Sequence, residues 1–405
     1  MESPKKIAFV SWHNYLDQTN GASISTRAML AGLTERNWNL QTLCGPAFDS
    51  LSQSLEECFS KNRQIRFLSE KKSGGSDYPY SMFSFRDGSI DSVAFKPLPK
   101  SPSQQAFNCR YADEFLSLYK AYLATQKPDL VITYGGAFVR DQILRWARCC
   151  CCKTCAAIHN YAYNDPFYFR YADLVIVPSF HCQRFYEEVG VRTIVIPPVI
   201  DLSPFRKHSP FSFDKRKFLL FVNPTTNKGV YWFAGLAKEL WKIRPDIPIL
   251  VVEGSAGIDS LTNPALGLNC VNNINFVRNT PFPQIFYDIA RVILIPSLFN
   301  EYFCRVAAEA MASGVPIIAS NRGAIPETVQ DAGILLDIPS KYTPNSKIVP
   351  SPEELQRWIE AILRFWDDEA FCQKYVDLGK RRAYSLWDND FIIDRYDQQF
   401  RELIR

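Results

Sequence analysis

Short apolar runs alternate with longer segments in which apolar residues recur at helical spacing, along most of this 405-residue chain. This alternation is typical of parallel sheets whose strands are connected by helices. In the N-terminal half, the apolar runs predict strands at Ile7–Ser11, Asn39–Cys44, Leu130–Thr133, Thr154–Ile158, Leu174–Pro178 and Thr193–Ile196. The amphipathic segments predict helices at Ser23–Glu35, Asp113–Thr125, Val139–Cys149 and Phe180–Val189. Residues 60–108, rich in Ser, Lys and Pro, fit neither pattern, and we expect irregular loops there.

A second series of the same kind follows the proline-rich stretch Pro197–Pro210, which we interpret as a linker. Its predicted strands are Phe218–Val222, Ile249–Glu253, Ile274–Val277, Val292–Ile295 and Val315–Ser320. Its predicted helices are Val230–Ile243, Pro283–Ala290 and Phe303–Ser313, followed by a helical tail from Glu353. The two series predict an α/β fold with two doubly wound Rossmann-like domains, residues 1–208 and 209–384, facing each other across a cleft.

The length and charge of the chain agree with two ordinary globular domains. A chain of 405 residues exceeds what one core usually supports. A net charge of +4 argues against a nucleic-acid partner, and the small basic excess of the N-terminal half allows an anionic acceptor or loose contact with an anionic membrane surface. Because the first apolar run is too short for a signal sequence and no run approaches transmembrane length, we expect a cytoplasmic protein.

Twelve cysteines without a secretion signal indicate reduced thiols. The run Cys149–Cys152, followed by Cys155, contains one C-x-x-C pair and allows a metal site. No second pair accompanies it, and adjacent cysteines cannot all face one metal. We therefore favour a buried helix end running into a strand, with cysteine as a small apolar residue.

The densest chemical signal lies in residues 292–338. Glu301 is predicted just before a helix, in the loop above a strand end, and Glu309 lies nearly two turns inside that helix among alanines. Small neighbours let a ligand approach the helix closely, and the amides at its N-terminus point toward an anion above them. The residues predict a site for a polyol attached to a phosphate.

A second candidate element runs from Asn223 to Gly229, between a predicted strand and a predicted helix. Backbone amides there can hold a phosphate, and Lys228 supplies a positive charge for a departing diphosphate. The spacing does not fit a Walker A loop. An isolated lysine at a helix start is more often solvated than functional, but this placement favours a role in binding.

Two further candidates lie in the N-terminal half. His159 follows a predicted strand, where an imidazole can bond a sugar hydroxyl, although a lone histidine is more often a satisfied loop residue; His13 is the second choice. Gly21 opens the first long helix and lets the backbone approach a ligand, and Ser23 can cap that helix. A plain turn explains Gly21 equally well.

Residues 292–338 resemble the signature of the retaining glycosyltransferases of family 4, which have the GT-B fold and take a sugar from a nucleotide-sugar donor. The matching residues are Pro296, Ser297, Glu301, Glu309, Ala310, Met311, Ala312, Gly314, Pro316, Gly323, Pro326 and Glu327. The end of the chain, from Ser385, resembles the closing helix of this family, which implies that residues 385–405 pack back on the first domain.

The chain also departs from the family pattern. The loop that contains Lys228 is similar to the diphosphate-binding element of the family, but Asn223-Pro224 replaces its usual Gly-Arg. Arg278, Arg305 or Arg322 are candidates to replace the missing charge. In the first glycine loop, Gly21 stands where the family commonly has two glycines.

The resemblance implies a glycosyl transferase that moves a sugar with retention, without a divalent metal or other cofactor, as in polysaccharide biosynthesis. The donor would be a UDP- or GDP-sugar, for example, and the acceptor a saccharide, a lipid-linked sugar or a small molecule. It implies catalytic roles for His159, Lys228 and Glu301. The implied donor-binding residues are Gly21, Asn223, Lys228, Ser297, Glu301, Tyr302, Phe303, Cys304, Arg305 and Glu309. A non-catalytic nucleotide-sugar-binding protein of the same fold, and an epimerase or phosphorylase of that fold, remain alternatives.

Overall fold

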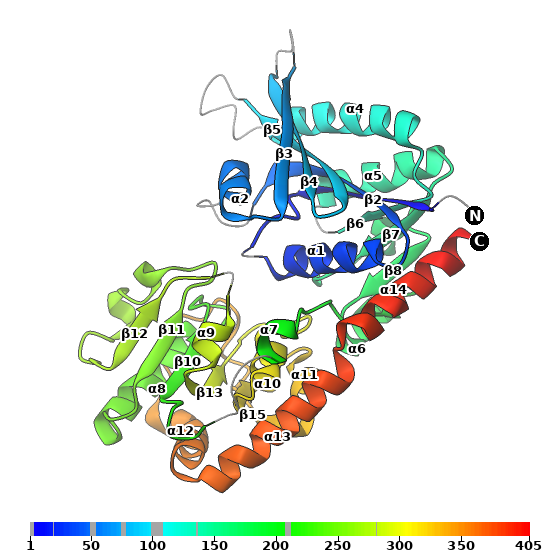
Figure 1. The fold of residues 1–405 in the computed structure, drawn as a ribbon. Coiled ribbons are helices and arrows are strands. Elements are labelled where there is room, and N and C mark those ends of the chain that lie inside the picture. Colours follow the sequence, from blue (N-terminus) through cyan, green and yellow to red (C-terminus); the bar gives the residue numbers. More distant parts are fainter. Residues whose placement is uncertain are drawn as a thin grey trace. The chain divides into compact units, whose positions relative to one another are not determined.

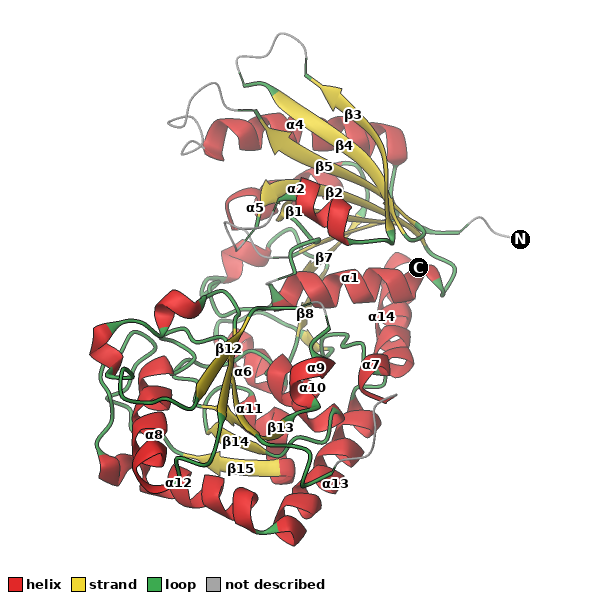
Figure 2. Cartoon of the chain, turned by 60° about the vertical axis from the view of Figure 1, so that its left-hand side comes forward, coloured by secondary structure: helices red, strands yellow, loops and turns green. Residues whose placement is uncertain are grey.

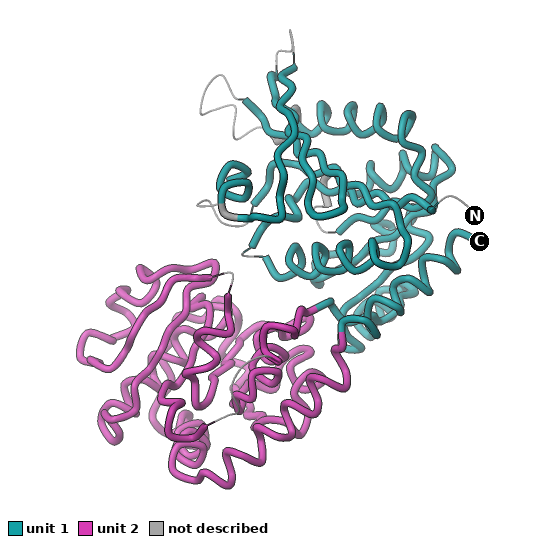
Figure 3. The backbone as a smooth tube through the Cα atoms, in the orientation of Figure 1, with its two compact units in different colours: residues 1–199, 389–405 teal, residues 200–388 magenta. Residues whose placement is uncertain are grey.

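The computed structural model describes residues 4–18, 20–48, 54–73, 78–98, 108–134, 137–206, 212–280 and 282–405. The chain forms two compact units (Figure 3). The N-terminal unit is Met1–Val199 together with Asn389–Arg405, and the C-terminal unit is Ile200–Asp388. The boundary expected after residue 208 falls outside the described residues.

The N-terminal unit is built on one twisted sheet (Figures 1 and 2). Its strands are β1 (Lys6–His13), β2 (Asn39–Ala47), β3 (Ile65–Lys72), β4 (Tyr80–Asp87), β5 (Ile90–Pro97), β6 (Leu130–Thr133), β7 (Lys153–Ala157), β8 (Leu174–Val177) and β9 (Ile194–Val195). They lie in the order β3-β4-β5-β2-β1-β6-β7-β8-β9. All neighbouring pairs from β5 to β9 in this order are parallel, so the prediction of a parallel sheet is confirmed.

Helices cover both faces of this sheet (Figure 1). They are α1 (Gly21–Thr34), α2 (Leu55–Lys61), α4 (Asn108–Gln126), α5 (Ala137–Cys149), α6 (Phe180–Glu188) and α14 (Asn389–Ile404). Buried residues of α1 and α14 pack in one core with Ile7 and Phe9 of β1, whereas α4 and α5 pack in another core with Ala8 and Val10 of the same strand. Because alternate residues of a strand face opposite sides, β1 lies between two helical layers.

The prediction of irregular loops over residues 60–108 is wrong for the described part of that segment. It contains β3, β4 and β5, which form an antiparallel meander at the sheet edge. In β4 buried and half-buried residues alternate, and a two-residue turn, with Gly88 at φ 60°, joins it to β5. Gly88-Ser89 as a two-residue connection between strands is a hairpin signal. The edge strand β3 is exposed apart from Ile65, so it shows little of the apolar pattern from which a strand is predicted.

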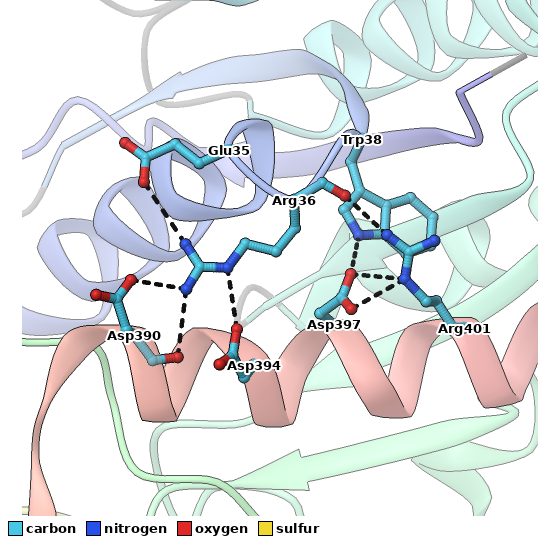
Figure 4. A network of polar contacts seen from close by, with 7 residues as sticks. All are labelled: Glu35, Arg36, Trp38, Asp390, Asp394, Asp397 and Arg401. Atoms are coloured by element: carbon cyan, nitrogen blue, oxygen red, sulfur yellow. Dashed lines mark hydrogen bonds and ion pairs between the residues drawn. The ribbon is translucent and has the colours of Figure 1, made fainter.

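The C-terminal helix α14 packs its apolar stripe in the same core as α1, and a polar network joins it to the turn that follows α1 (Figure 4). The guanidinium of Arg36 contacts Asp390 at 2.7 Å and Asp394 at 3.0 Å. The buried indole Nε1 of Trp38 donates to Oδ1 of Asp397 at 2.6 Å, and the same carboxylate pairs with Arg401 at 2.9 Å. The expectation that the last helix packs on the first domain therefore has a specific chemical basis.

The C-terminal unit contains a fully parallel sheet. Its strands are β10 (Phe218–Val222), β11 (Ile249–Val252), β12 (Ile274–Val277), β13 (Ala290–Ile295), β14 (Ile317–Ser320) and β15 (Gly333–Leu336), in the order β12-β11-β10-β13-β14-β15. Its helices are α7 (Ser203–Arg206), α8 (Val230–Ile243), α9 (Gln284–Tyr287), α10 (Arg305–Ala312), α11 (Ile325–Val329), α12 (Pro352–Asp367) and α13 (Glu369–Leu386). One core joins α8 and α12 to the sheet, and a second joins α9, α10, α11 and α13 to its other face. The prediction of doubly wound α/β units is confirmed.

No helix among the described residues combines the length and the apolar content that crossing a bilayer requires.

We expect Asp397→Ala to destabilise the N-terminal unit by about 1–3 kcal/mol, because it leaves the buried indole N–H of Trp38 without an acceptor. Asp394→Ala removes an exposed partner of Arg36 from the same helix and should cost about 0–1 kcal/mol. Urea unfolding followed by circular dichroism compares the two variants. Equal losses would show that the bond to Trp38 carries no special weight.

Candidate functional site

The direction of winding in the C-terminal unit reverses between β10 and β13. From β10 the chain moves outward through β11 and β12, and it then returns to β13 on the other side and continues to β14 and β15. The loops that leave the carboxyl ends of β10 and β13 therefore diverge to opposite faces of the sheet. Such a switch point leaves a crevice, and ligands of open α/β sheets bind there.

An ion pair connects the two diverging loops. Nζ of Lys228, from the loop after β10, lies 2.6 Å from Oε1 of Glu301, from the loop after β13. Oγ of Ser297 donates to the same carboxylate oxygen at 2.7 Å. Glu301 and Ser297 are buried, while the side chain of Lys228 is 25% exposed. The residues that the sequence singled out from two separate segments thus meet at the switch point.

Two glycines with positive φ allow these loops to come together. Gly229 has φ 83°, and a Cβ on it would lie 2.0 Å from the carbonyl oxygen of Pro296. Gly323 has φ 59°, and its Cβ would lie 2.3 Å from the amide nitrogen of Glu301. Both positions require a backbone that other residues adopt at a cost and a space that no side chain can share. The loop after β14 therefore supports the backbone of Glu301 directly.

The second carboxylate of the predicted pair, Glu309, lies on α10 and has two partners. Arg305 Nη2 is 3.2 Å from its Oε1, and the hydroxyl of Tyr287 donates to its Oε2 at 3.2 Å. Burial, followed by the negative charge of Glu309, raises the pKa of Tyr287 well above its ordinary value, so this hydroxyl stays a donor across the physiological range. Each oxygen of Glu309 is thereby fixed in direction.

The helix predicted over Phe303–Ser313 begins two residues later, at Arg305, and Cys304 is its N-cap residue. Burial, followed by the nearby charge of Glu301, raises the pKa of the Cys304 thiol to about 12, so this side chain is a neutral packing group. The ring of Phe303 packs edge-on against Trp387, and that of Tyr302 against Phe299. Tyr302, Phe303 and Cys304 thus lie just before the first turn of α10, as predicted. Their contact with a nucleotide-sugar donor stays a prediction.

The candidates for the missing positive charge differ in what they contact. Arg322 donates to the carbonyl oxygens of Leu298, Ile338 and Pro339 and so holds loops together. Arg305 faces Glu309, and Arg278 is exposed just after β12. The side-chain oxygen of Asn223 accepts a hydrogen bond from the backbone nitrogen of Ser255 at 3.1 Å. Its predicted contact with a nucleotide-sugar donor would therefore use its side-chain nitrogen or its backbone.

His159 and Gly21 lie in the N-terminal unit, at the carboxyl edge of its sheet. His159 is half-buried, and its ring meets that of Tyr134 edge-on at 6.3 Å. Gly21 is the first residue of α1, but the cap of this helix is Asn20, whose side chain accepts from the amides of residues 22 and 23. The expected cap, Ser23, instead bonds the hydroxyl of Tyr134 at 2.7 Å.

The cysteine run divides into two groups. Cys152 and Cys155 are buried, as expected, whereas Cys149, Cys150 and Cys151 are exposed, so the prediction of a buried run is wrong for these three. The helix ends there, and Cys151 adopts φ 60° in the turn that follows. Within the described ranges no group of three or more His, Cys, Asp or Glu side chains is placed to hold a metal ion.

Two supporting residues escaped the sequence reasoning. Tyr287 was hidden in an apolar stretch that reads as core, because nothing in its neighbourhood points to Glu309, which lies 22 positions later. Gly323 supports the backbone of Glu301, and only its place in the family motif pointed to it. Its contact with Glu301 depends on how two loops pack.

Residues 204–382, which lie within the C-terminal unit, match the model of the family Glycosyl transferases group 1. Among curated proteins, the lipopolysaccharide 1,2-N-acetylglucosaminetransferase of Salmonella typhimurium is 28% identical over 178 residues, which are 39% of this chain and 46% of the relative. The chain spans about half the length of the curated relatives it matches.

Solved structures resemble the chain over nearly its whole length. Sucrose-phosphate synthase from Thermosynechococcus elongatus has a TM-score of 0.70 at 18% identity and covers 98% of this chain and 99% of its own. Anabaena Alr3699/HepE in complex with UDP and glucose has a TM-score of 0.67 at 16% identity, with 98% and 100% covered. These likenesses show that the chain has the GT-B fold, as its sequence predicted.

We expect Gly323→Ala to displace the loop that holds Glu301, because the new Cβ would collide with backbone atoms. Gly267→Ala is the matched control: it has φ 65° in the same unit, but its Cβ would meet only the side chain of Lys238, at 3.4 Å. Each variant should lose about 1–2 kcal/mol from the left-handed backbone, and Gly323→Ala about 1–3 kcal/mol more. Thermal unfolding measures this difference, and similar melting temperatures for the two variants would contradict the close packing at Glu301.

Proposed function

We propose that this protein is a retaining glycosyltransferase of family 4 that takes a sugar from a nucleotide-sugar donor bound in the C-terminal unit. The observation that carries the proposal is the contact between Lys228 and Glu301 at the switch point of a unit that matches the glycosyl transferases group 1. A cation and a carboxylate at this place match the two parts of such a donor, its diphosphate and its sugar hydroxyls.

In the proposed bound state, Lys228 turns from Glu301 to the donor diphosphate. The C–O bond between the anomeric carbon and the diphosphate breaks, and its electron pair moves to the departing phosphate oxygen. Lys228 and the backbone at the tip of α10 stabilise this growing negative charge in a site with little water. The side chain of Lys228 is partly exposed, so its ammonium group can reach a ligand.

Glu301, released from Lys228, accepts hydrogen bonds from sugar hydroxyls. Ser297 keeps its hydrogen bond to the carboxylate and holds its direction. The acceptor hydroxyl attacks the anomeric carbon from the face that the diphosphate leaves, and its proton passes to the diphosphate oxygen. In this scheme His159 bonds a hydroxyl of the sugar, and no divalent metal takes part.

Glu309 is proposed to bind the ribose of the donor. A carboxylate pairs well with two neighbouring hydroxyls, since both of its oxygens are acceptors. Tyr287 and Arg305 fix the carboxylate from either side. A UDP-sugar is our first choice of donor because Alr3699/HepE, a structure of the same fold, has been solved with UDP and glucose. The acceptor is proposed to be a saccharide or another hydroxyl-bearing small molecule.

A nucleotide-sugar-binding protein without catalysis is the second candidate. It is favoured by the replacement of the usual arginine after β10, since Asn223 there bonds the loop that follows β11. Transfer or donor hydrolysis by the purified protein separates the two candidates.

Lys228→Ala and Glu301→Ala should each lower kcat of transfer by roughly 10²–10³-fold, because each removes a group that stabilises charge or position in the transition state. Lys242→Ala is the control: it breaks an exposed Lys–Glu pair on α8 and should keep full activity. Steady-state kinetics measure the change. Unchanged turnover in both site variants would falsify the proposed site.

A thermal-shift series with UDP-, GDP- and ADP-sugars should raise the melting temperature with one base preferred. At a donor concentration of 100 Kd, binding to the folded state adds about 2.7 kcal/mol of stability. The same series with Glu309→Ala should lose most of the shift if the ribose binds there. A shift that survives this substitution would place the ribose elsewhere.

A further inference from the structure

A buried arginine in the N-terminal unit has no role in the site described above. Arg140 lies in the first turn of α5, and only 1% of its surface is exposed. Its Nη2 donates to the carbonyl oxygen of Tyr168 at 3.1 Å. Its Nε and Nη1 have no hydrogen-bond partner within the part of the chain that the structure describes.

Among the described residues, no carboxylate forms an ion pair with the guanidinium of Arg140. The neighbouring carboxylate, Asp141, is engaged by Arg170 at 2.7 Å. Burial lowers the pKa of Arg140 in spite of the nearby Asp141 and tyrosines, which shows that the surroundings do not compensate for lost water. Unpaired buried charges are costly, and buried arginines are normally paired with anions.

Aromatic rings enclose the guanidinium on one side. It lies 3.8 Å from the ring centre of Tyr163 and 5.2 Å from that of Phe169. These residues belong to the segment 160–171, which follows β7 and contains the short helix η1 (Pro166–Phe169). The segment is held to α5 by Arg140 itself and by the partly exposed pair of Arg170 with Asp141.

The position of Arg140 in the fold is one where ligands bind. The N-terminal sheet has its own switch point between β1 and β6, because the strands from β2 to β5 lie on one side of β1 and those from β6 to β9 lie on the other. Arg140 is on the helix that leaves β6 at the carboxyl edge, and His159 and Tyr134 follow strands at the same edge. A planar fork of donors at such an edge suits an oxyanion.

We propose that Arg140 binds a carboxylate or phosphate group of the acceptor, which replaces the carbonyl oxygen of Tyr168 as its partner when segment 160–171 opens. Calling this ligand the acceptor rests on the proposed function, whereas the binding of an oxyanion does not. The subsite selects acidic sugars or sugar phosphates over neutral sugars.

The experiment measures binding of glucuronate, glucose 6-phosphate, inorganic phosphate and glucose to the full chain by calorimetry and thermal shift. The wild type should bind glucuronate or glucose 6-phosphate, and glucose at least about tenfold more weakly, since hydrogen bonds between charged groups are the strong ones. Preference for glucuronate or for glucose 6-phosphate identifies the acidic group, and binding of free phosphate alone would overturn an acceptor subsite.

Arg140→Met should weaken binding of the preferred anion at least tenfold, and Arg140→Lys should weaken it less, because it keeps the charge but loses the fork. The matched control is Arg145→Met, which removes one exposed positive charge from the same helix and should change affinity less than about twofold. Equal losses in the two methionine variants would reduce the effect to general electrostatics and overturn the proposal. Absence of anion binding by the wild type would overturn it without any variant.

UDP binding, measured on the same proteins, keeps this inference separate from the proposed function. Arg140→Met should bind UDP like the wild type, and circular dichroism checks that its N-terminal unit is folded. If UDP binds but anions do not, the acceptor subsite fails and the donor site stands. If anions bind through Arg140 but no nucleotide sugar binds, the proposed function fails and the oxyanion subsite stands.

Discussion

The organisation of the C-terminal unit depends on the ion pair between Lys228 and Glu301. A largely buried pair gains little net stability, since the desolvation of both charges offsets most of their attraction. Its value is therefore geometric: it joins two loops that leave neighbouring strands in opposite directions. The loops can meet only because Gly229 and Gly323 occupy backbone and space that no other residue tolerates at low cost. The two glycines allow the loops to meet, and the ion pair then joins them.

The same pair explains how the site can be stable without a ligand and still ready for one. With no donor present, Lys228 and Ser297 both bond the carboxylate of Glu301, so none of these groups is left buried and unsatisfied. In the proposed function, an incoming diphosphate would offer Lys228 a stronger counter-charge, and sugar hydroxyls would offer Glu301 new donors. This exchange would conserve hydrogen bonds on both sides, and only a ligand that carries both kinds of group could complete it.

Much of the C-terminal unit could be predicted from sequence because its signals are local. The strand β10 and the helix α8 have the predicted bounds, since a continuous apolar run and an amphipathic stretch each report on their own segment. Glu301 and Lys228 were found through motifs a few residues long. Their contact spans 73 positions and was not predicted, because no local pattern reports on a contact between two distant segments.

The failures have physical causes too. The meander β3–β5 was missed because an exposed edge strand has little apolar pattern to show, although the Gly88-Ser89 turn marked it. Ser23 was expected to cap α1, but Asn20 is equally suited to that role and stands where the helix begins. Arg140 could not have been recognised at all, because its burial depends on a segment more than twenty residues later in the chain.

The two switch points differ in which groups neutralise their positive charges. This difference bears on how each unit would bind and release a ligand. At the C-terminal one, Lys228 and Arg305 each face a carboxylate that the chain itself supplies. At the N-terminal one, Arg140 faces aromatic rings and one carbonyl oxygen. A site whose charges are balanced by its own residues can release a ligand and remain intact, which in the proposed function would suit a diphosphate that leaves after each turnover. A buried cation whose counter-charge comes from a ligand would give its unit the lowest free energy when that anion is bound. If Arg140 binds the acceptor as proposed, acceptor binding rather than donor binding would complete the N-terminal unit.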